Sequence, residues 1–302
     1  MRRYWSLLLL LAAVWGASYL LIKLAVEEIS PAATMAFRVA VAALLLVPYA
    51  ARLYGVRGLV VRLREAWRPC AVLGLNNAAL PFWLVAWGET HVDSSIAAIA
   101  QSSVPIFNLL IALRVLPHER VAPSRALGLA AGLAGVALVT GLHPQGGLHA
   151  VVGTLAVVLA SVSYASAGVY GQLRVRGTPG PILATGSMLA AALYLLPFGL
   201  AQLPAQAPGW RAWTGLLALT VLGTALAQIV LFRILAGWGS ARLSLVTYLM
   251  PGFAVVYGAF VLDEPVSASA LAGLGLILLG VAFASGGVPR PRRERTAAAA
   301  EG

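Results

Sequence analysis

Long apolar runs separated by short polar breaks dominate the hydrophobic pattern of this 302-residue chain. Each run lasts about 20 residues, which is the length that an α-helix needs to cross a hydrocarbon core about 30 Å thick. Backbone groups inside a bilayer must be paired within their own segment, and the alternating pattern of a barrel strand is absent, so helices are predicted. The ten predicted spans are residues 6–26, 32–50, 69–88, 94–116, 124–142, 151–170, 181–200, 214–234, 242–262 and 268–286.

Turn-forming and charged residues fill the breaks between these runs. Examples are the Gly-Thr-Pro-Gly sequence at 177–180 and the Asp-Glu-Pro sequence at 263–265. Composition agrees, because 60% of the residues are hydrophobic and only 10% are charged, whereas a soluble domain carries about 25% charged residues. A soluble fold is therefore excluded. The single cysteine, Cys70, also excludes a disulfide framework and a cysteine-based metal site.

The basic residues indicate how the chain is oriented in the membrane. With the N-terminus in the cytoplasm and ten alternating spans, eighteen of the 21 Lys and Arg residues fall in cytoplasmic segments. Arg211 alone falls on the outer side, and Lys23 and Arg38 lie inside predicted helices. Such an excess of Arg and Lys in cytoplasmic loops follows the positive-inside rule. We therefore expect both termini in the cytoplasm and a multi-pass location in a bacterial-type inner (plasma) membrane.

The net charge of +11 does not indicate nucleic-acid binding, because the charges lie in short gaps between apolar runs. The expected partner of the protein is the lipid bilayer. The pair Arg2 and Arg3 before an apolar run is also typical of a signal peptide. The run continues to Leu24 at full spanning length, which favours a retained first helix. The sequence is compatible with a homodimer and does not fix the oligomeric state.

A second pattern repeats after 145 residues, where 119–141 match 264–286. Each half contains five spans, an odd number, so the two halves are expected to have opposite orientations. We expect one repeat over residues 1–142, an inverted repeat over 143–288, and a basic, disordered cytoplasmic tail at 289–302. The matching pairs include Glu119 with Glu264, Gly128 with Gly273 and Gly135 with Gly280, and, after a small drift in the offset, Gly74 with Gly223 and Pro105 with Pro251.

Inverted repeats around a midplane site are the architecture of many secondary transporters. Two similar halves packed in opposite senses can rock between an inward-open and an outward-open state of nearly equal energy. The predicted fold class is therefore an all-α integral membrane protein, with ten transmembrane helices arranged as two inverted five-helix repeats around a central cavity.

Several short motifs occur in a characteristic order over roughly residues 6–286. They are Trp15-Gly16, Ile22-Lys23, Pro31, Phe37-Arg38, Pro105, Glu119-Arg120, Gly128, Gly132 and Gly135 in the first half, and Pro251, Glu264 and Gly273 to Gly280 in the second. In this order the chain resembles the drug/metabolite transporter superfamily, and within it the EamA-like ten-helix transporters. The resemblance implies export or exchange of amino acids or related metabolites. It also implies a cavity lined by the first, third, fourth, sixth, eighth and ninth helices, with the fifth and tenth outside it.

Two charged residues inside predicted spans are candidates for substrate binding or gating, because charge within a membrane is costly. Arg38 lies about two turns into the second span, and Lys23 lies near the outer end of the first. Either could attract a substrate carboxylate. The structural alternatives are that Lys23 reaches the outer surface or pairs with Glu27, and that Arg38 braces helix ends by bonding carbonyls.

Polar and aromatic residues on the predicted cavity helices form the rest of the candidate site. The alternative role for any of them is hydrogen bonding between helices. The two prolines among them are candidate hinges, because a proline frees a carbonyl inside a helix. The candidates are Trp15, Tyr19, Asn76, Asn77, Gln101, Ser102, Asn108, Tyr164, Gln228 and Tyr248, with Pro105 and Pro251 as hinges.

The acidic residues fall at the ends of predicted helices, among them Glu89, Asp93 and Glu264. A proton-coupled carrier usually keeps a titratable acid in its pathway, so coupling is either absent or runs through a terminal acid. No catalytic, metal-binding or nucleotide-binding motif is recognisable, and neither a metal nor another cofactor is expected.

The sequence thus predicts a non-enzymatic secondary carrier that exports or exchanges small polar metabolites by alternating access. The alternatives are an intramembrane lipid-modifying enzyme and a channel or receptor. Inverted halves favour the carrier over both.

Overall fold

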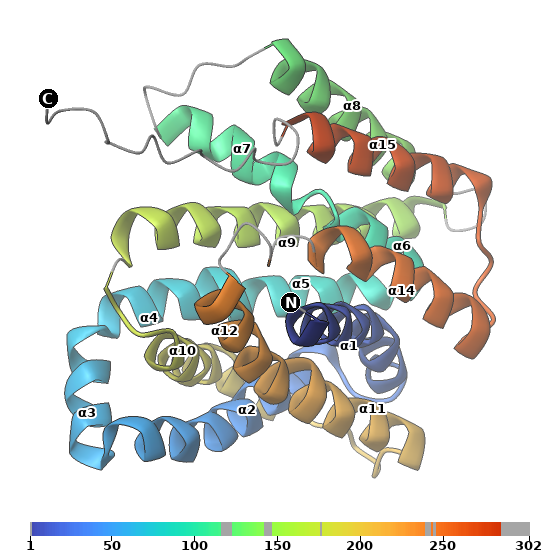
Figure 1. The fold of residues 1–302 in the computed structure, drawn as a ribbon. Coiled ribbons are helices and arrows are strands. Elements are labelled where there is room, and N and C mark those ends of the chain that lie inside the picture. Colours follow the sequence, from blue (N-terminus) through green and yellow to red (C-terminus); the bar gives the residue numbers. More distant parts are fainter. Residues whose placement is uncertain are drawn as a thin grey trace, which may run out of the picture.

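The computed structural model describes residues 2–115, 123–141, 147–175, 177–238, 243 and 246–284. Every regular element in these ranges is a helix (Figure 1). The predicted tail at 289–302 and Glu119 lie outside this description. In the first half the helices are α1 (Arg2–Val26), α2 (Pro31–Tyr54), α3 (Val56–Glu65), α4 (Trp67–Gly74), the π-helical segment η1 (Leu75–Ala79), α5 (Leu80–Glu89), α6 (Ser94–Gln101), α7 (Val104–Val115) and α8 (Pro123–Gly141).

The second half follows the same all-helical plan. Its helices are α9 (Gly147–Arg174), α10 (Gly180–Leu200), α11 (Trp210–Thr220), the π-helical segment η2 (Val221–Leu226), α12 (Ala227–Trp238), α14 (Val246–Val261) and α15 (Ala268–Ala284). Continuous helical stretches, such as α4 to α5 and α11 to α12, form single spans from several elements.

Seven helical stretches in the described ranges are long and apolar enough to cross a membrane. They are Tyr4–Val26, Pro31–Tyr54, Trp67–Glu89, Ser94–Val115, Gly147–Arg174, Gly180–Leu200 and Trp210–Leu231. Shorter apolar helices cover Ala126–Val139, Leu249–Val261 and Ala268–Phe283. The chain is therefore a multi-pass, helical integral membrane protein.

The start of α2 shows how the sequence sets a helix boundary. Ser30 precedes the helix, and its hydroxyl accepts a hydrogen bond from the Ala33 amide at 3.2 Å. Pro31 occupies the first helical position, where its missing N–H costs nothing. The same Ser30 hydroxyl donates to the Gln202 carbonyl at 2.8 Å, which fixes the turn before α2 against the loop after α10.

Helix α3 was not predicted, because residues 56–65 lie in the break between the predicted spans 32–50 and 69–88. The apolar residues Val56, Leu59, Val60 and Leu63 recur at helical spacing, which gives the segment one apolar face. Leu59 is buried, while the arginines of α3 remain exposed. The loop therefore contains an amphipathic helix, which runs across the ends of its neighbours at the left of Figure 1.

Helices α8 and α15 pack closely on each other at the periphery, beside α6, α7 and α9 (Figure 1). Their contact depends on glycine, because a methyl group on Gly280 would lie 2.6 Å from both the Gly128 carbonyl oxygen and the Gly132 amide nitrogen. Small residues let membrane helices approach this closely.

The remaining helices surround the interior of the molecule. Helix α1 packs on α14 and α11, while α9 packs on α5 and α7, and α2 packs on α10. The largest buried apolar cluster combines residues of α2, α5, α6, α9 and α10. This arrangement holds the polar residues described below between rigid helices.

Candidate functional site

A cavity of about 520 Å³ lies between the helices. This volume is within the range of small-molecule sites, about 300 to 1,000 Å³. Most elements contribute to its lining, from α1 through α14, whereas α8 and α15 contribute no residue. Arg38 of α2 and Leu183, Ala184 and Ser187 of α10 also line it, so the lining extends to two helices that the family resemblance did not include.

Arg38 is the one charged side chain among the described residues that line the cavity. Its Nε donates a hydrogen bond to Thr224 Oγ1 at 2.8 Å, and its guanidinium carbon lies 3.9 Å from the centroid of the Phe82 ring. Only 6% of its surface is exposed. Arg38 therefore bonds a side chain and not the helix-end carbonyls that a bracing role requires. A fixed guanidinium in a desolvated site is suited to bind a carboxylate.

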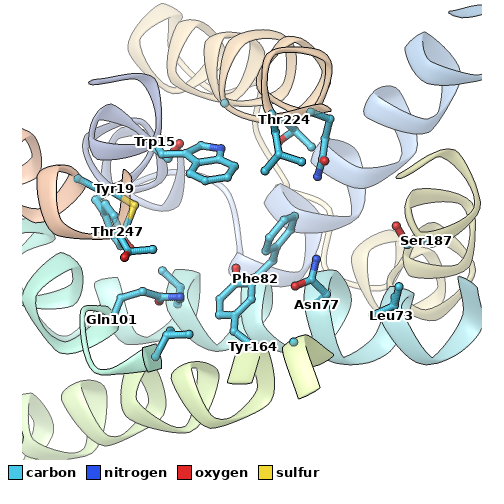
Figure 2. A pocket seen from close by; sticks show the side chains of 18 of the residues that line it. Trp15, Tyr19, Leu73, Asn77, Phe82, Gln101, Tyr164, Ser187, Thr224 and Thr247 are labelled. Carbon is cyan, nitrogen blue, oxygen red and sulfur yellow. The ribbon is translucent and has the colours of Figure 1, made fainter. Parts of the chain in front are cut away.

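Aromatic side chains form much of the cavity wall. Phe82 and Tyr164 lie in its centre, with ring centroids 6.4 Å apart and planes tilted by 52° (Figure 2). Trp15 and Tyr19 line it from α1, one helical turn apart. These rings offer apolar surface beside the Arg38 guanidinium, which fits a ligand with both a charged group and an apolar part.

The π-helical segments bring polar groups to the cavity. In η1, Asn77 lines the cavity, whereas Asn76 does not and instead donates to the Val72 carbonyl at 3.2 Å. In η2, Gly223 and Thr224 line the cavity, and Thr224 positions Arg38. Such bulges occur often at functional sites. Neither segment carries a recognisable sequence signal, because π-helical hydrogen bonding is set by packing.

The fourth predicted span breaks at the cavity. Helix α6 ends at Gln101, a turn follows, and α7 begins at Val104, one residue before Pro105. Proline has no N–H, so it cannot donate to the Gln101 carbonyl four residues earlier. Gln101, Ser102, Pro105 and Asn108 all line the cavity around this break.

Two of these groups differ in how they are paired. The Gln101 Oε1 atom is buried and has no hydrogen-bond partner. The Ser102 hydroxyl, in contrast, donates to the Ala98 carbonyl of its own helix at 3.0 Å. Gln101 therefore provides an unused acceptor beside the cavity.

The remaining candidates are in the second half of the chain. Gln228 lines the cavity. Pro251 is buried inside a continuous α14 and does not line the cavity, and its hinge role stays a prediction. The side chain of Tyr248 lies outside the described part of the chain.

Lys23 does not line the cavity but forms hydrogen bonds beyond it. Its Nζ donates to the carbonyl oxygens of Glu89 at 2.7 Å and of Val92 at 2.9 Å. The ammonium thus ties α1 to the turn between α5 and α6. The side chain is partly buried, and the described residues show no ion pair between Lys23 and Glu27. A role of Lys23 in substrate binding or gating stays a prediction.

Glu89 and Glu264 are buried acids that the sequence placed only at helix ends. Glu264 accepts hydrogen bonds from the amides of Ser94 at 2.7 Å and Ser95 at 3.0 Å, which caps the N-terminus of α6. Glu89 is fully buried, and neither of its carboxyl oxygens has a hydrogen-bond partner. Sequence reasoning missed Glu89, because its position at the end of a span suggests exposure. The intramembrane Lys23 was the one available hint of a buried acid nearby.

The cavity lining comes within about one helical turn of both ends of the helices. Leu183 and Thr247 line it from the first turns of α10 and α14. At the opposite end the last lining residues are Ile22 and Val85, and beyond them lie the partly buried contacts of Lys23. Polar contacts therefore occupy the Lys23 end of the molecule.

The multi-pass helical fold and an internal cavity with Arg38 and a few polar groups on a mostly apolar wall are those of a membrane transporter. The family model described as EamA-like transporter family matches residues 3–141 and 151–286. The chain belongs to the EamA-like transporter family, as its motifs indicated. It is a transporter of that family, and its relatives are named as transporters and not as enzymes.

Several relatives resemble the chain over nearly its full length. An uncharacterized transporter YvbV of Bacillus subtilis is 27% identical and covers 91% of this chain and 89% of its own length. An uncharacterized inner membrane transporter YedA of Escherichia coli is 28% identical, with 89% and 86% covered. A probable terminal-alkyne amino-acid exporter of Streptantibioticus cattleyicolor is 29% identical, with 92% and 91% covered. One solved crystal structure shares the fold with a TM-score of 0.64 at 20% identity, covering 94% of this chain and 97% of that one.

Proposed function

We propose that the protein is a secondary transporter that exports or exchanges small polar metabolites, such as amino acids, by alternating access. The observation that carries this proposal is the Arg38 guanidinium, held by Thr224 and Phe82 at the wall of a 520 Å³ cavity. The guanidinium can pair with the carboxylate of a substrate, and the neighbouring amides and aromatic rings can contact the rest of that substrate. A relative named as a probable amino-acid exporter supports the same substrate class.

The proposed arrangement for alternating access is two five-helix repeats inverted around the cavity, in a protein of ten spans. The helix contacts support this arrangement, because α1 packs on α14 and α11 as α9 packs on α7 and α5. Under the repeat these are corresponding sets of helices. Of the paired glycines, Gly74 directly precedes η1 and Gly223 lies within η2.

The orientation follows from the charge distribution. Placement of both termini in the cytoplasm puts α3 and the Arg174 end of α9 on the cytoplasmic side. The Lys23 contacts then lie at the outer end. A relative named as an inner membrane transporter supports the same location.

An intramembrane lipid-modifying enzyme is the main alternative. It would need convergent acids or histidines at the cavity, and Arg38 is the one charged group among the described lining residues. A channel or receptor is the other alternative, and it is distinguished by non-saturable flux or by no flux.

Flux through the purified protein in liposomes tests the proposal. Radiolabelled common amino acids are added outside, and saturable uptake against an unlabelled internal pool is expected. The Arg38→Ala variant should insert normally and lose transport, because removal of a charge-assisted hydrogen bond costs about 1.5 to 3 kcal/mol of binding, or about 10- to 100-fold.

Arg233→Ala is the matched control, because Arg233 is exposed and does not line the cavity. This variant should transport as the wild type does. Normal transport by Arg38→Ala, or turnover of lipid without amino-acid flux by the wild type, would contradict the proposal.

A further inference from the structure

The Glu89 carboxyl group is the polar group least explained by the transport site described above. It lies at the last residue of α5 and has no exposed surface. Neither carboxyl oxygen has a hydrogen-bond partner. A buried carboxylate is costly unless it is paired, and an unpaired acid at such a site avoids this cost by binding a proton.

The charged groups that act on Glu89 are already engaged elsewhere. Lys23 and Glu264 act on it most directly, and Arg38 lies further inside the cavity. Lys23 donates to two carbonyls, Arg38 donates to Thr224, and Glu264 accepts from two amides of α6. None of the three therefore makes a hydrogen bond to the Glu89 carboxyl group.

Other titratable groups also lie around this end of the molecule. Tyr19 on α1 is buried and interacts electrostatically with Glu89. His91 follows α5, and its ring lies 4.4 Å from the Trp87 ring centroid with the planes tilted by 42°. It also stacks on His149 of α9 at 6.1 Å between ring centroids. Asp93 precedes α6 and makes interactions of its own. The experiment must therefore separate Glu89 from histidines and from a second carboxyl group.

Glu89 is directly connected to the substrate cavity through two helices. Val85 lines the cavity one turn before Glu89 on α5, and Tyr19 lines it one turn before Lys23 on α1. Residues four apart share one helix face, about 6 Å from each other. Movement of α1 or α5 around a bound substrate therefore shifts Lys23 and Glu89 directly.

We propose that Glu89 is the proton-binding residue of this transporter and that its proton controls the Lys23 contacts. The step is the reversible binding of one proton by the carboxylate, which gives the neutral acid. The protonated acid leaves Lys23 bonded to the carbonyls of Glu89 and Val92. The ionised form attracts the ammonium away from them, so α1 separates from the turn between α5 and α6. This inference rests on the transport function proposed above.

Infrared difference spectroscopy on the purified full-length protein tests proton binding without any substrate. A protonated carboxylic acid has its own C=O stretching band, which histidine and tyrosine lack. The wild type should show this band near neutral pH, and it should disappear in Glu89→Gln. The band should remain in Glu65→Gln, the matched control, because Glu65 is exposed on α3.

Glu89→Asp keeps the carboxyl group and should shift the band without removing it. If Glu89→Gln does not elute as a monodisperse species, the pair of wild type and Glu89→Asp decides the question. A band that is absent from the wild type, or that is the same in all of these proteins, would overturn the proposal. Because this readout needs no flux, it holds whether or not amino acids prove to be the substrate.

A second measurement tests whether proton binding by Glu89 is coupled to transport. In liposomes with a mixture of radiolabelled amino acids, a gradient of about one pH unit should change the accumulation ratio of the wild type up to about tenfold. The ratio in Glu89→Gln should not respond to the gradient, while Glu65→Gln should respond as the wild type does. An undiminished response in Glu89→Gln would assign the coupling to another group. Absence of any flux in the wild type would instead count against the proposed function alone.

Discussion

Arg38 combines a buried charge with two different contacts. The hydrogen bond to Thr224 fixes the Nε side of the guanidinium, and the Phe82 ring covers one face of its plane. Together they prevent the side chain from rotating, so its remaining N–H groups are oriented before a substrate arrives. Preorganisation of this kind lowers the entropy cost of binding.

Thr224→Val tests whether this orientation matters. Valine keeps the shape of threonine and removes the acceptor for Arg38 Nε. Loss of one hydrogen bond of about 1 kcal/mol should raise the apparent KM for transport about fivefold. Thr220→Val is the matched control, since Thr220 donates to Leu216 of its own helix and does not touch Arg38.

A double variant that combines Arg38→Ala with Thr224→Val makes this test more specific, because the effects of substitutions at residues in direct contact are coupled. Once Arg38 is alanine, Thr224→Val should add no further loss to the remaining binding of amino acid. A full additive effect would show that Thr224 acts on the substrate independently of Arg38. Isothermal titration of the purified proteins measures both outcomes.

At this scale the sequence predicts part of the site. The cost of charge in a membrane identifies Arg38, and polar residues on apolar helices identify Asn77, Gln101 and Gln228. Asn76 fails to line the cavity because the π-helical register of η1 turns it back to its own helix. Glu89 was missed because burial at a helix end depends on neighbours that are distant in the sequence.

At the scale of helices, glycine at one crossing sets the distance between α8 and α15. Gly280→Val should disrupt this pair, because its first added carbon would meet the Gly128 carbonyl oxygen and the Gly132 amide nitrogen at 2.6 Å. Overpacking costs about 1 to 3 kcal/mol. The apparent Tm of the protein in detergent should fall by at least about 3 °C.

Gly275→Val on the same helix is the matched control. The first carbon added at Gly275 would meet no atom within 4 Å, so this variant should keep the apparent Tm of the wild type. Equal losses in both variants would mean that valine disturbs α15 itself and not its contact with α8.

Helix boundaries were predictable where the chain carries a local signal. The start of α2 at Pro31 follows from Ser30 and the proline, and the predicted start of the last span matches α15 at Ala268. Helix α9 extends beyond the predicted 151–170 at both ends, because helices continue past the apolar part of their sequence. The π-helical segments had no local signal, since they result from packing against other helices.

At the scale of the whole molecule, one account joins the charge distribution, the repeat and the cavity. In the proposed arrangement, an odd number of spans in each half turns the second half over, so corresponding loops face opposite compartments. The cavity then lies between the halves. Rocking of the halves would open the Lys23 end and close the other.

Chemical labelling of single cysteines tests this arrangement most directly. Cys70 is buried and is replaced by alanine, and cysteine is then introduced at Thr178, before α10, or at Pro265, before α15. A maleimide that cannot cross membranes is added to intact cells and to inverted vesicles. The account predicts labelling of Pro265→Cys only from the outer side and of Thr178→Cys only from the cytoplasmic side. Labelling of both positions from the same compartment would contradict the inverted halves, and with them the alternating-access mechanism.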